Sequence, residues 1–242
     1  SGTAVANLFP AIIEADLSMT PLIIITADRP THLINTGENQ TIKQTKIFNN
    51  YVRKSLSIES GINSIENIAE EINKSILLSL GKNSKKPSGP IHINISFDEP
   101  LVDMIETIKD LNVSNTNINN KASTYNIPKC SKPIIICGAM DSDRYIDNIL
   151  SLSDSLNAPI FADPLSQIRF NKNHTNIISH YDYLIELMNE KPDCVIRFGK
   201  KSTTSKKLNN LIKNCTNVIL FSNNNGYNDD CKIIKPLNFD LI

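Results

Sequence analysis

The chain has 242 residues, of which 40% are hydrophobic and 21% charged, and its formal net charge at pH 7 is zero. This composition is typical of a globular protein with one large domain or two small ones. A chain without net charge has no global field to attract nucleic acid or an anionic membrane. No stretch approaches the roughly 20 apolar residues that cross a bilayer. We therefore expect no nucleic-acid partner and no membrane insertion.

The cysteines give no sign of a metal site or a disulfide framework. Cys130, Cys137, Cys194, Cys215 and Cys231 are odd in number, widely spaced and without a CxxC pair. The first residues also lack the charged region and the cleavage site of a signal peptide. We therefore expect free thiols, no metal ligands in this chain and a cytoplasmic location.

The first residues predict a helix followed by a buried strand. Apolar residues at helical spacing predict a helix over residues 2–15, which Pro10 should bend. The Ile-rich run 22–26 is typical of a buried parallel strand. Arg29 follows in the loop, where Pro30 holds it extended.

The next segment continues the alternation of helices and strands. We expect a short helix near residues 41–48 and strands at 52–58 and 91–97. Between these strands lies the clearest amphipathic helix of the chain, which Ser64 could cap at its start and Gly81 at its end. Short apolar strands that alternate with a helix predict a parallel α/β sheet.

A polar, Asn-rich stretch at residues 103–131 predicts a linker. Beyond it, strands and helices alternate again, which predicts a second, Rossmann-like domain with right-handed crossovers. The predicted strands are 132–137, 159–162, 194–198 and 218–221, and the predicted helices are 145–156, 183–188 and 204–212.

Polar side chains follow two of the predicted strands, at the edge where open α/β sheets bind ligands. Arg29, with Asn39-Gln40 in the same loop, follows the first strand, and Lys200, Lys201, Lys206 and Lys207 follow strand 194–198. Arg grips a carboxylate with two donors, Lys supplies a point charge, and Asn and Gln both donate and accept. Together they favour a small anionic ligand.

The same residues also admit a plain structural interpretation. An Arg after a strand and a basic run on the first turn of a helix are usually solvated charges, although positive charge there opposes the helix dipole. Only Gly138 follows strand 132–137, and no GxGxxG motif occurs, so a dinucleotide site is weakly indicated. His92, inside a strand, is expected to be buried and hydrogen-bonded. The residue pattern alone predicts no more than a two-domain α/β protein with a candidate anion site.

Four motifs in fixed order carry a resemblance to an enzyme family: SGTAVANLFPAIIEA, IIITADRP, TGENQTIKQ and GPIHINISFDEPL. The chain resembles the thiamine-diphosphate (ThDP)-dependent 2-succinyl-5-enolpyruvyl-6-hydroxy-3-cyclohexene-1-carboxylate (SEPHCHC) synthases of menaquinone biosynthesis. The match covers residues 1–101, with looser stretches at 162–169 and 197–208. It implies that residues 1–102 are the C-terminal part of a pyrimidine-binding (PYR) domain. It also implies that residues 132–242 are a central Rossmann-like domain, and that the diphosphate-binding domain is absent.

The resemblance also implies an activity for the complete enzyme. The ThDP ylide attacks 2-oxoglutarate, carbon dioxide is lost, and the four-carbon succinyl-semialdehyde unit is added to isochorismate, with Mg²⁺ as second cofactor in a homo-oligomer (a dimer or tetramer). The family's catalytic Glu lies upstream of Ser1, and its magnesium-binding GDG motif lies downstream. The chain therefore looks like a fragment, and we expect it to be inactive alone.

Particular residues match the family's site. Ser1, Gly2 and Thr3 match the segment near the aminopyrimidine ring of the cofactor. Arg29, Asn39 and Gln40 fall on positions that contact the substrate or the ThDP-bound intermediate. Lys206 and Lys207 fall on a basic pair that reaches the same site from the central domain. The second position of this pair varies in the family, and the loop before it is one residue longer here.

Other interpretations stay open. A sibling ThDP enzyme, such as an acetohydroxyacid synthase or a pyruvate decarboxylase, carries Gly-Pro-Gly where this chain has Gly2-Thr3-Ala4, and the TADRP and ENQ segments favour the synthase. A non-catalytic module whose central domain binds an effector or nucleotide is the other alternative. It calls for a glycine-rich phosphate loop after Ile136, where only Gly138 is present.

Overall fold

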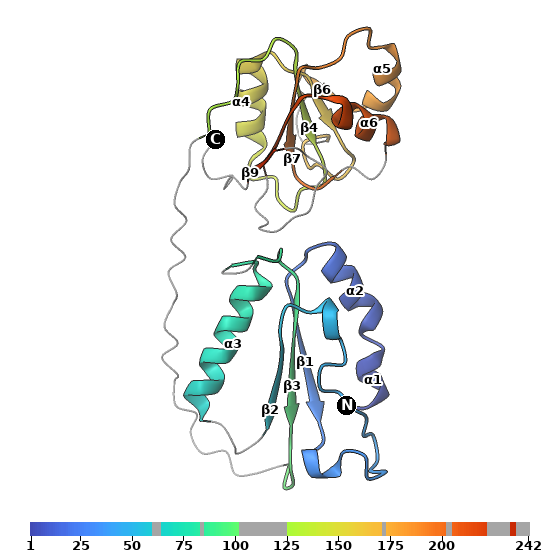
Figure 1. Ribbon diagram of the computed structural model, residues 1–242, viewed down its shortest axis with the longest axis vertical. Coiled ribbons are helices and arrows are strands. Elements are labelled where there is room, and N and C mark those ends of the chain that lie inside the picture. The colour runs from blue at the N-terminus through green and yellow to red at the C-terminus, as the bar shows by residue number, and fades with distance from the viewer. Residues whose placement is uncertain are drawn as a thin grey trace. The chain divides into compact units, whose positions relative to one another are not determined.

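The computed structural model describes residues 1–59, 64–82, 85–101, 125–170, 173–201 and 205–221, and the backbone of 233–235. These residues form two compact units, one before and one after the stretch 102–124. Each unit is a parallel sheet with helices on both faces, as Figure 1 shows. The α/β fold expected from the sequence is therefore confirmed, whereas the predicted linker lies largely outside the described residues.

The first unit is a three-stranded sheet in which the last strand lies in the middle. The strand order is β1-β3-β2, with both neighbours parallel to β3. Helices α1 and α2 cover one face and α3 covers the other (Figure 1). The elements are α1 (Thr3–Ala6), α2 (Phe9–Leu17), β1 (Leu22–Asp28), the 3-10 helices η1 (Thr31–Leu33) and η2 (Asn49–Tyr51), β2 (Ser55–Glu59), α3 (Ile65–Ser79) and β3 (Pro90–Ser96).

One local prediction for this unit is confirmed only in part, and another is wrong. The helix expected over residues 2–15 is broken into α1 and α2, with Pro10 in the first turn of α2. Proline is tolerated in a first turn, where its missing N–H is not needed, but within a continuous helix it clashes with the preceding turn. The short helix expected near residues 41–48 is absent, and left-handed backbone at Gln40 (φ 56°) and Lys46 (φ 56°) is incompatible with it.

Helix α3 confirms both predicted caps. The Ser64 hydroxyl accepts a hydrogen bond from the Asn67 amide at 3.3 Å. At the other end, Gly81 has φ 69°, and the amides of Gly81 and Lys82 donate to the carbonyls of Leu78 and Leu77 at 3.0 and 2.8 Å. This is the Schellman arrangement, which requires a left-handed residue after the helix.

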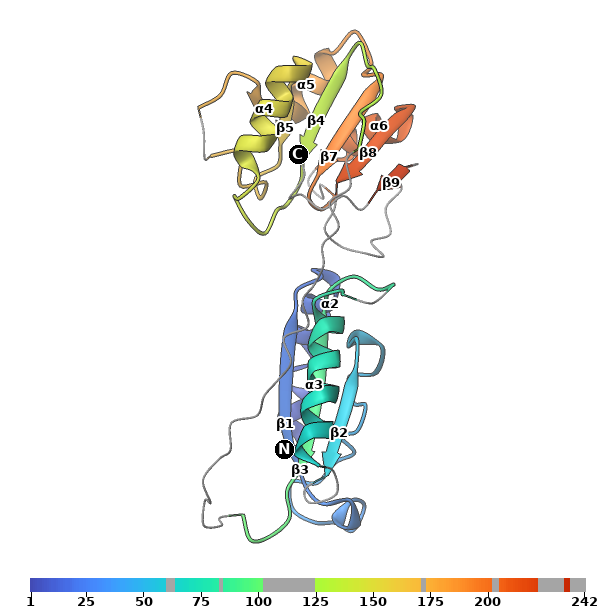
Figure 2. The ribbon, with the colours of Figure 1, turned by 90° about the vertical axis from the view of Figure 1, so that its left-hand side faces the viewer.

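The second unit is a six-stranded parallel sheet in the order β6-β5-β4-β7-β8-β9. This is the doubly wound Rossmann order, in which the winding reverses between β4 and β7. Helix α4 covers one face, and α5 and α6 cover the other (Figure 2). The strands are β4 (Pro133–Cys137), β5 (Ile160–Ala162), β6 (Ile177–Ile178), β7 (Cys194–Phe198), β8 (Asn217–Phe221) and β9 (Ile233–Lys235), and the helices are α4 (Ile146–Leu156), α5 (Tyr181–Leu187) and α6 (Lys206–Asn214).

The core of the second unit is mostly apolar, although the buried Arg197 lies in β7. Strands β4 and β7 are buried along their whole length, and their cysteines, Cys137 and Cys194, are free thiols. Burial raises the pKa of Cys137 above its usual range and that of Cys194 to about 12. Thiols of this kind act as small core residues and not as nucleophiles. Within the described ranges, every helix is too short or too polar to span a membrane.

The loops after β4 and β7 contact each other through backbone atoms. They do so between the two central strands, where the direction of winding reverses. The Gly138 amide donates to the Phe198 carbonyl and the Lys200 amide to the Ala139 carbonyl, both at 2.9 Å. A Cβ on Gly138 would lie 1.7 Å from the Lys200 carbonyl oxygen. The loops can approach this closely only because Gly138 has no side chain.

We predict that Gly138→Ala destabilises the second unit by at least roughly 2 kcal/mol. The new methyl group would overlap the Lys200 carbonyl, and this backbone cannot rotate away as a flexible side chain could. Gly37→Ala is the control, since nothing lies within 4 Å of its Cβ position and only its positive φ opposes the change. Urea unfolding followed by circular dichroism measures both. A Gly138→Ala midpoint equal to that of wild type contradicts the prediction.

Candidate functional site

Two rows of polar residues cross the carboxyl end of the first sheet. The register of the parallel strands places neighbours on the same face. One row therefore consists of Thr26, Asn94 and Ser57, and the next of Asp28, Ser96 and Glu59. The carboxyl edge of an open α/β sheet is where ligands bind. The fold therefore concentrates side-chain donors and acceptors at the position where a ligand is expected.

A cavity of about 80 Å³ lies over these rows. Asp28, Arg29, Thr31, Glu59 and Asn94 are among its lining residues. The Thr31 hydroxyl donates to Glu59 at 2.6 Å. The Nε atom of Arg29 is buried and has no hydrogen-bond partner among the described residues. An unpartnered guanidinium N–H is unfavourable, so an acceptor oxygen is the group that would satisfy it.

A network of buried side chains adjoins the cavity and shares Asp28 and Asn94 with its lining. The Gln44 side-chain amide donates to the Ala27 carbonyl and to Asn94 Oδ1, both at 2.9 Å. The Asn94 amide donates to Asp28 Oδ2 at 2.7 Å, and the other oxygen of Asp28 accepts from the Arg29 backbone amide at 2.8 Å. Gln44 is fully buried, and Asn94 and Asp28 are nearly so. The carboxyl end of β1 is therefore held by hydrogen bonds from its neighbours.

His92 is buried, as expected from the sequence, and belongs to the same network. The Thr26 hydroxyl donates its single proton to Asn94 Oδ1 at 2.7 Å. The His92 Nε2, 2.8 Å from Thr26 Oγ1, must therefore be the protonated ring nitrogen and the donor. The Nδ1 atom is buried without a partner among the described residues, and Phe48 packs edge-on against the ring. Burial lowers the pKa of His92 from 6.5 to about 4, although the Asp28 carboxylate opposes this shift.

The predicted cofactor segment lies against the predicted substrate loop. Gly2 has φ 66°, and a Cβ added to it would lie 3.0 Å from the Gln40 carbonyl oxygen. Its amide donates to Gln44 Oε1 at 2.7 Å. Ser1 and Thr3, on either side, are exposed. The structure thus brings together segments that are about 40 residues apart in the chain.

Asn39 and Gln40 are exposed, so their side chains are available to a ligand. The Asn39 backbone amide donates to Glu38 at 3.1 Å, and Gln40 is held in the left-handed region. Their contact with substrate stays a prediction.

Lys206 and Lys207 occupy the first turn of α6, as predicted, in the second unit. The Ser205 hydroxyl caps this helix by accepting from the Leu208 amide at 3.0 Å. Lys207 pairs with Glu186 at 2.6 Å, and the hydrogen bond raises the pKa of Lys207. Lys206 is exposed. That both reach the site of Arg29 stays a prediction.

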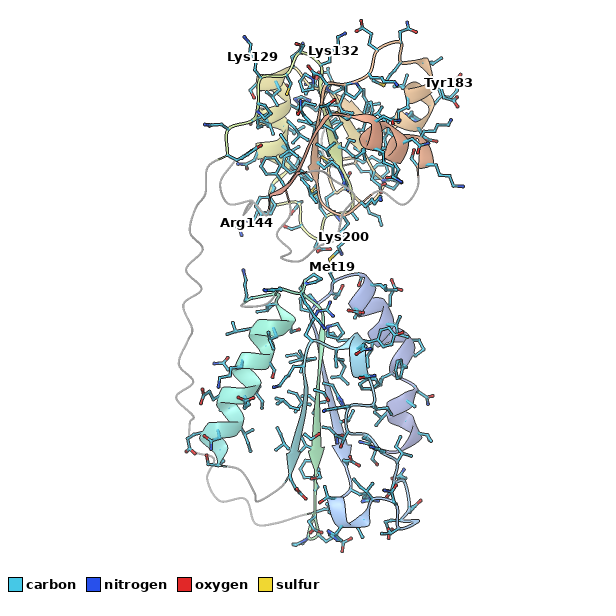
Figure 3. The ribbon with its side chains drawn as sticks, viewed as in Figure 1. Met19, Lys129, Lys132, Arg144, Tyr183 and Lys200 are labelled. Carbon is cyan, nitrogen blue, oxygen red and sulfur yellow. The ribbon has the colours of Figure 1, made fainter. Side chains whose placement is uncertain are left out.

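Lys200 lies at the carboxyl end of β7, where Figure 3 labels it. Its ammonium group lies 3.5 Å from Asp141, so its charge has a partner at the surface. Among the described residues, no group of three or more His, Cys, Asp or Glu side chains gathers to hold a metal ion.

Sequence reasoning missed Gln44, Thr26 and Asn94. A signal for two of them was present, because polar residues alternate with isoleucine in the buried strand HINIS, and Thr26 follows an Ile run. Polar side chains at every second position of a buried strand must find partners on one face. Gln44 carried no such signal, because it lies in a loop.

The chain is similar to curated 2-succinyl-5-enolpyruvyl-6-hydroxy-3-cyclohexene-1-carboxylate synthases. It is 32% identical to that of Chlorobium phaeobacteroides over 95% of this chain, and 36% identical to those of Staphylococcus epidermidis and Staphylococcus saprophyticus over 88% and 100%. The chain spans 39–44% of the length of these relatives. No family model matches it. The resemblance inferred from the motifs is therefore confirmed, over nearly the whole chain.

We predict that His92 makes the first unit less stable in acid. Unfolded His92 binds a proton near pH 6.5, but in the folded protein it does so only near pH 4. The unfolding free energy should therefore fall between these values as the pH falls, by up to about 1.4 kcal/mol per pH unit. Denaturant unfolding across this range should show a shallower slope for His92→Gln, which does not titrate. His32→Gln, at an exposed histidine, is the control and should keep the wild-type slope.

Proposed function

We propose that this chain is part of a ThDP-dependent synthase that decarboxylates 2-oxoglutarate and adds the four-carbon unit to isochorismate. The observation that carries the proposal is the similarity to synthases of that name along 88–100% of the chain. Because the chain spans only part of these relatives, we place the catalytic Glu and the magnesium site in the rest of the complete protein. We also propose that this protein is a cytoplasmic homo-oligomer.

The N-terminal segment suits one part of the cofactor. Gly2 is buried at positive φ against the Gln40 backbone, which fixes the segment, and Ser1 and Thr3 on either side are exposed and available to a ring. We propose that Ser1, Gly2 and Thr3 hold this ring. When bound, ThDP supplies the carbanion chemistry that decarboxylation requires. The described residues do not form a metal-ligand cluster, so we assign no magnesium ligand to them.

Arg29 is the residue that we propose to bind a substrate carboxylate. Both substrates carry more than one carboxylate, and the buried Nε of Arg29 lacks a partner. The cavity beside it takes a carboxylate group and not a whole substrate, so the rest of the substrate must lie outside it. Asn39 and Gln40 can donate to its other oxygens, and Lys206 and Lys207 would add positive charge from the second unit.

The test uses the protein encoded by the complete reading frame that contains this sequence. With ThDP, Mg²⁺ and both substrates, we expect release of carbon dioxide from 2-oxoglutarate and consumption of isochorismate. Pyruvate in place of 2-oxoglutarate separates the synthase from an acetohydroxyacid synthase-like sibling. Activity on pyruvate alone, or no ThDP-dependent turnover, overturns the proposal.

We predict that the 242-residue chain alone neither turns over substrate nor binds ThDP tightly. The physical reason is that the catalytic Glu and the diphosphate-binding domain are expected outside it. Isothermal titration with ThDP and Mg²⁺ checks this, and micromolar affinity would contradict it.

We predict that Arg29→Lys lowers kcat/KM of the complete enzyme at least about tenfold, because lysine keeps the charge but loses the two-donor grip. The melting temperature should change little. Arg144→Lys, at an exposed arginine of the second unit, is the matched control and should keep wild-type kinetics. An Arg29→Lys enzyme with unchanged kcat/KM removes Arg29 from the site.

A further inference from the structure

We propose that Gln44 is a positioning residue, whose buried amide fixes the Ser1-Gly2-Thr3 segment to the carboxyl end of β1. This role rests on the proposed function, because it concerns the cofactor segment and Arg29 of the same site. Gln44 itself need not touch cofactor or substrate. It acts by holding two groups that do.

Gln44 connects three separate parts of the first unit. Its Oε1 accepts from the Gly2 amide at 2.7 Å, and its Nε2 donates to the Ala27 carbonyl and to Asn94 Oδ1 at 2.9 Å each. Gly2 precedes α1, Ala27 lies in β1 and Asn94 in β3. One side chain therefore joins the N-terminal segment to two neighbouring strands.

The orientation of the Gln44 amide is determined by its partners. Both Nε2 protons point to acceptors, and the only donor among the partners, the Gly2 amide, faces Oε1. A flipped amide would place Oε1 against two acceptors and Nε2 against a donor. Because Gln44 is fully buried, water cannot compensate for such a mismatch. Gly2 is therefore held at one position.

The hydrogen bonds continue from Gln44 to Arg29. The sequence of bonds runs from the Gly2 amide to Gln44, from Gln44 to Asn94 Oδ1, from the Asn94 amide to Asp28 Oδ2, and from Asp28 Oδ1 to the Arg29 amide. The side chains that form these bonds, those of Gln44, Asn94 and Asp28, are nearly or fully buried. Both oxygens of Asp28 and the side-chain amides of Gln44 and Asn94 take part in these bonds, and buried side chains paired in this way are rigid. The cofactor segment and the substrate arginine are thus held in one frame, with Gln44 as the link to Gly2.

The test compares Gln44→Met with Ser79→Ala in the complete enzyme. Methionine has a similar volume but cannot hold Gly2. The Ser79 hydroxyl donates to the Gly89 carbonyl at 2.7 Å and is also buried in the first unit, but its bond does not touch the network, so it controls for lost stability. We expect Gln44→Met to raise the KM for ThDP about tenfold, the effect of one lost buried hydrogen bond, with kcat less affected. Ser79→Ala should lower the melting temperature and leave this KM unchanged.

Gln44→Glu provides a second readout if Gln44→Met does not fold. Its carboxyl group can still accept from Gly2, but when ionised it faces the Ala27 and Asn94 oxygens, whereas the protonated form can donate to one of them. Burial raises the pKa of such a carboxyl. We therefore expect the KM for ThDP of this variant to improve as the pH falls, by more than that of wild type over the same range.

The outcomes separate the two proposals. If wild type turns over substrate and Gln44→Met matches Ser79→Ala in its KM for ThDP, Gln44 has only a structural role and this proposal is overturned. A Gln44→Glu enzyme with the wild-type pH profile overturns it as well. If wild type itself does not use ThDP, the proposed function fails and the role of Gln44 fails with it.

Discussion

The first unit depends on one constraint: β3 is the central strand and is buried on both faces, yet it carries His92, Asn94 and Ser96. Buried polar side chains must be paired, since each unpaired donor or acceptor loses its hydrogen bonds to water. Asn94 meets this demand by bonding Thr26, Gln44 and Asp28 at once. Those bonds, with the one from Gly2 to Gln44, hold three parts of the unit in place: the loop that carries Gln44, the N-terminal segment and the carboxyl end of β1.

The loop that carries Gln44 shows how far this constraint extends. To deliver the side chain beneath the sheet edge, the backbone adopts left-handed φ at Gln40 and Lys46 and forms no helix between them. Phe48, at the end of the loop, is fully buried and packs against both Phe9 and His92. Polar pairing and aromatic packing thus act on the same short segment, which leaves Asn39 and Gln40 at the surface beside Gly2.

The second unit is organised in the opposite way. Its central strands are apolar except for the buried Arg197 of β7, and main-chain groups next to Gly138 and Gly199 bond to one another at the reversal of the winding. The amides of Gly138 and Lys200 donate to carbonyls there, whereas a phosphate-binding loop directs its amides to the ligand. The functional charges predicted for this unit, Lys206 and Lys207, instead begin α6.

The sequence by itself determined the alternation of strands and helices, both caps of α3, the winding of the second unit and the family resemblance. These features rest on periodicity, on local capping and on motifs that are contiguous in the chain. Only the tertiary structure decided that residues 41–48 are not helical, that β6 and β9 exist, and that Gly2 meets Gln40 and Gln44. Strands as short as β6 carry too few residues to show a period, and the Gly2–Gln44 bond joins residues 42 apart. Such contacts arise only after the sheet has brought its carboxyl ends together, because a loop side chain finds its partners through the fold and not through its neighbours in sequence.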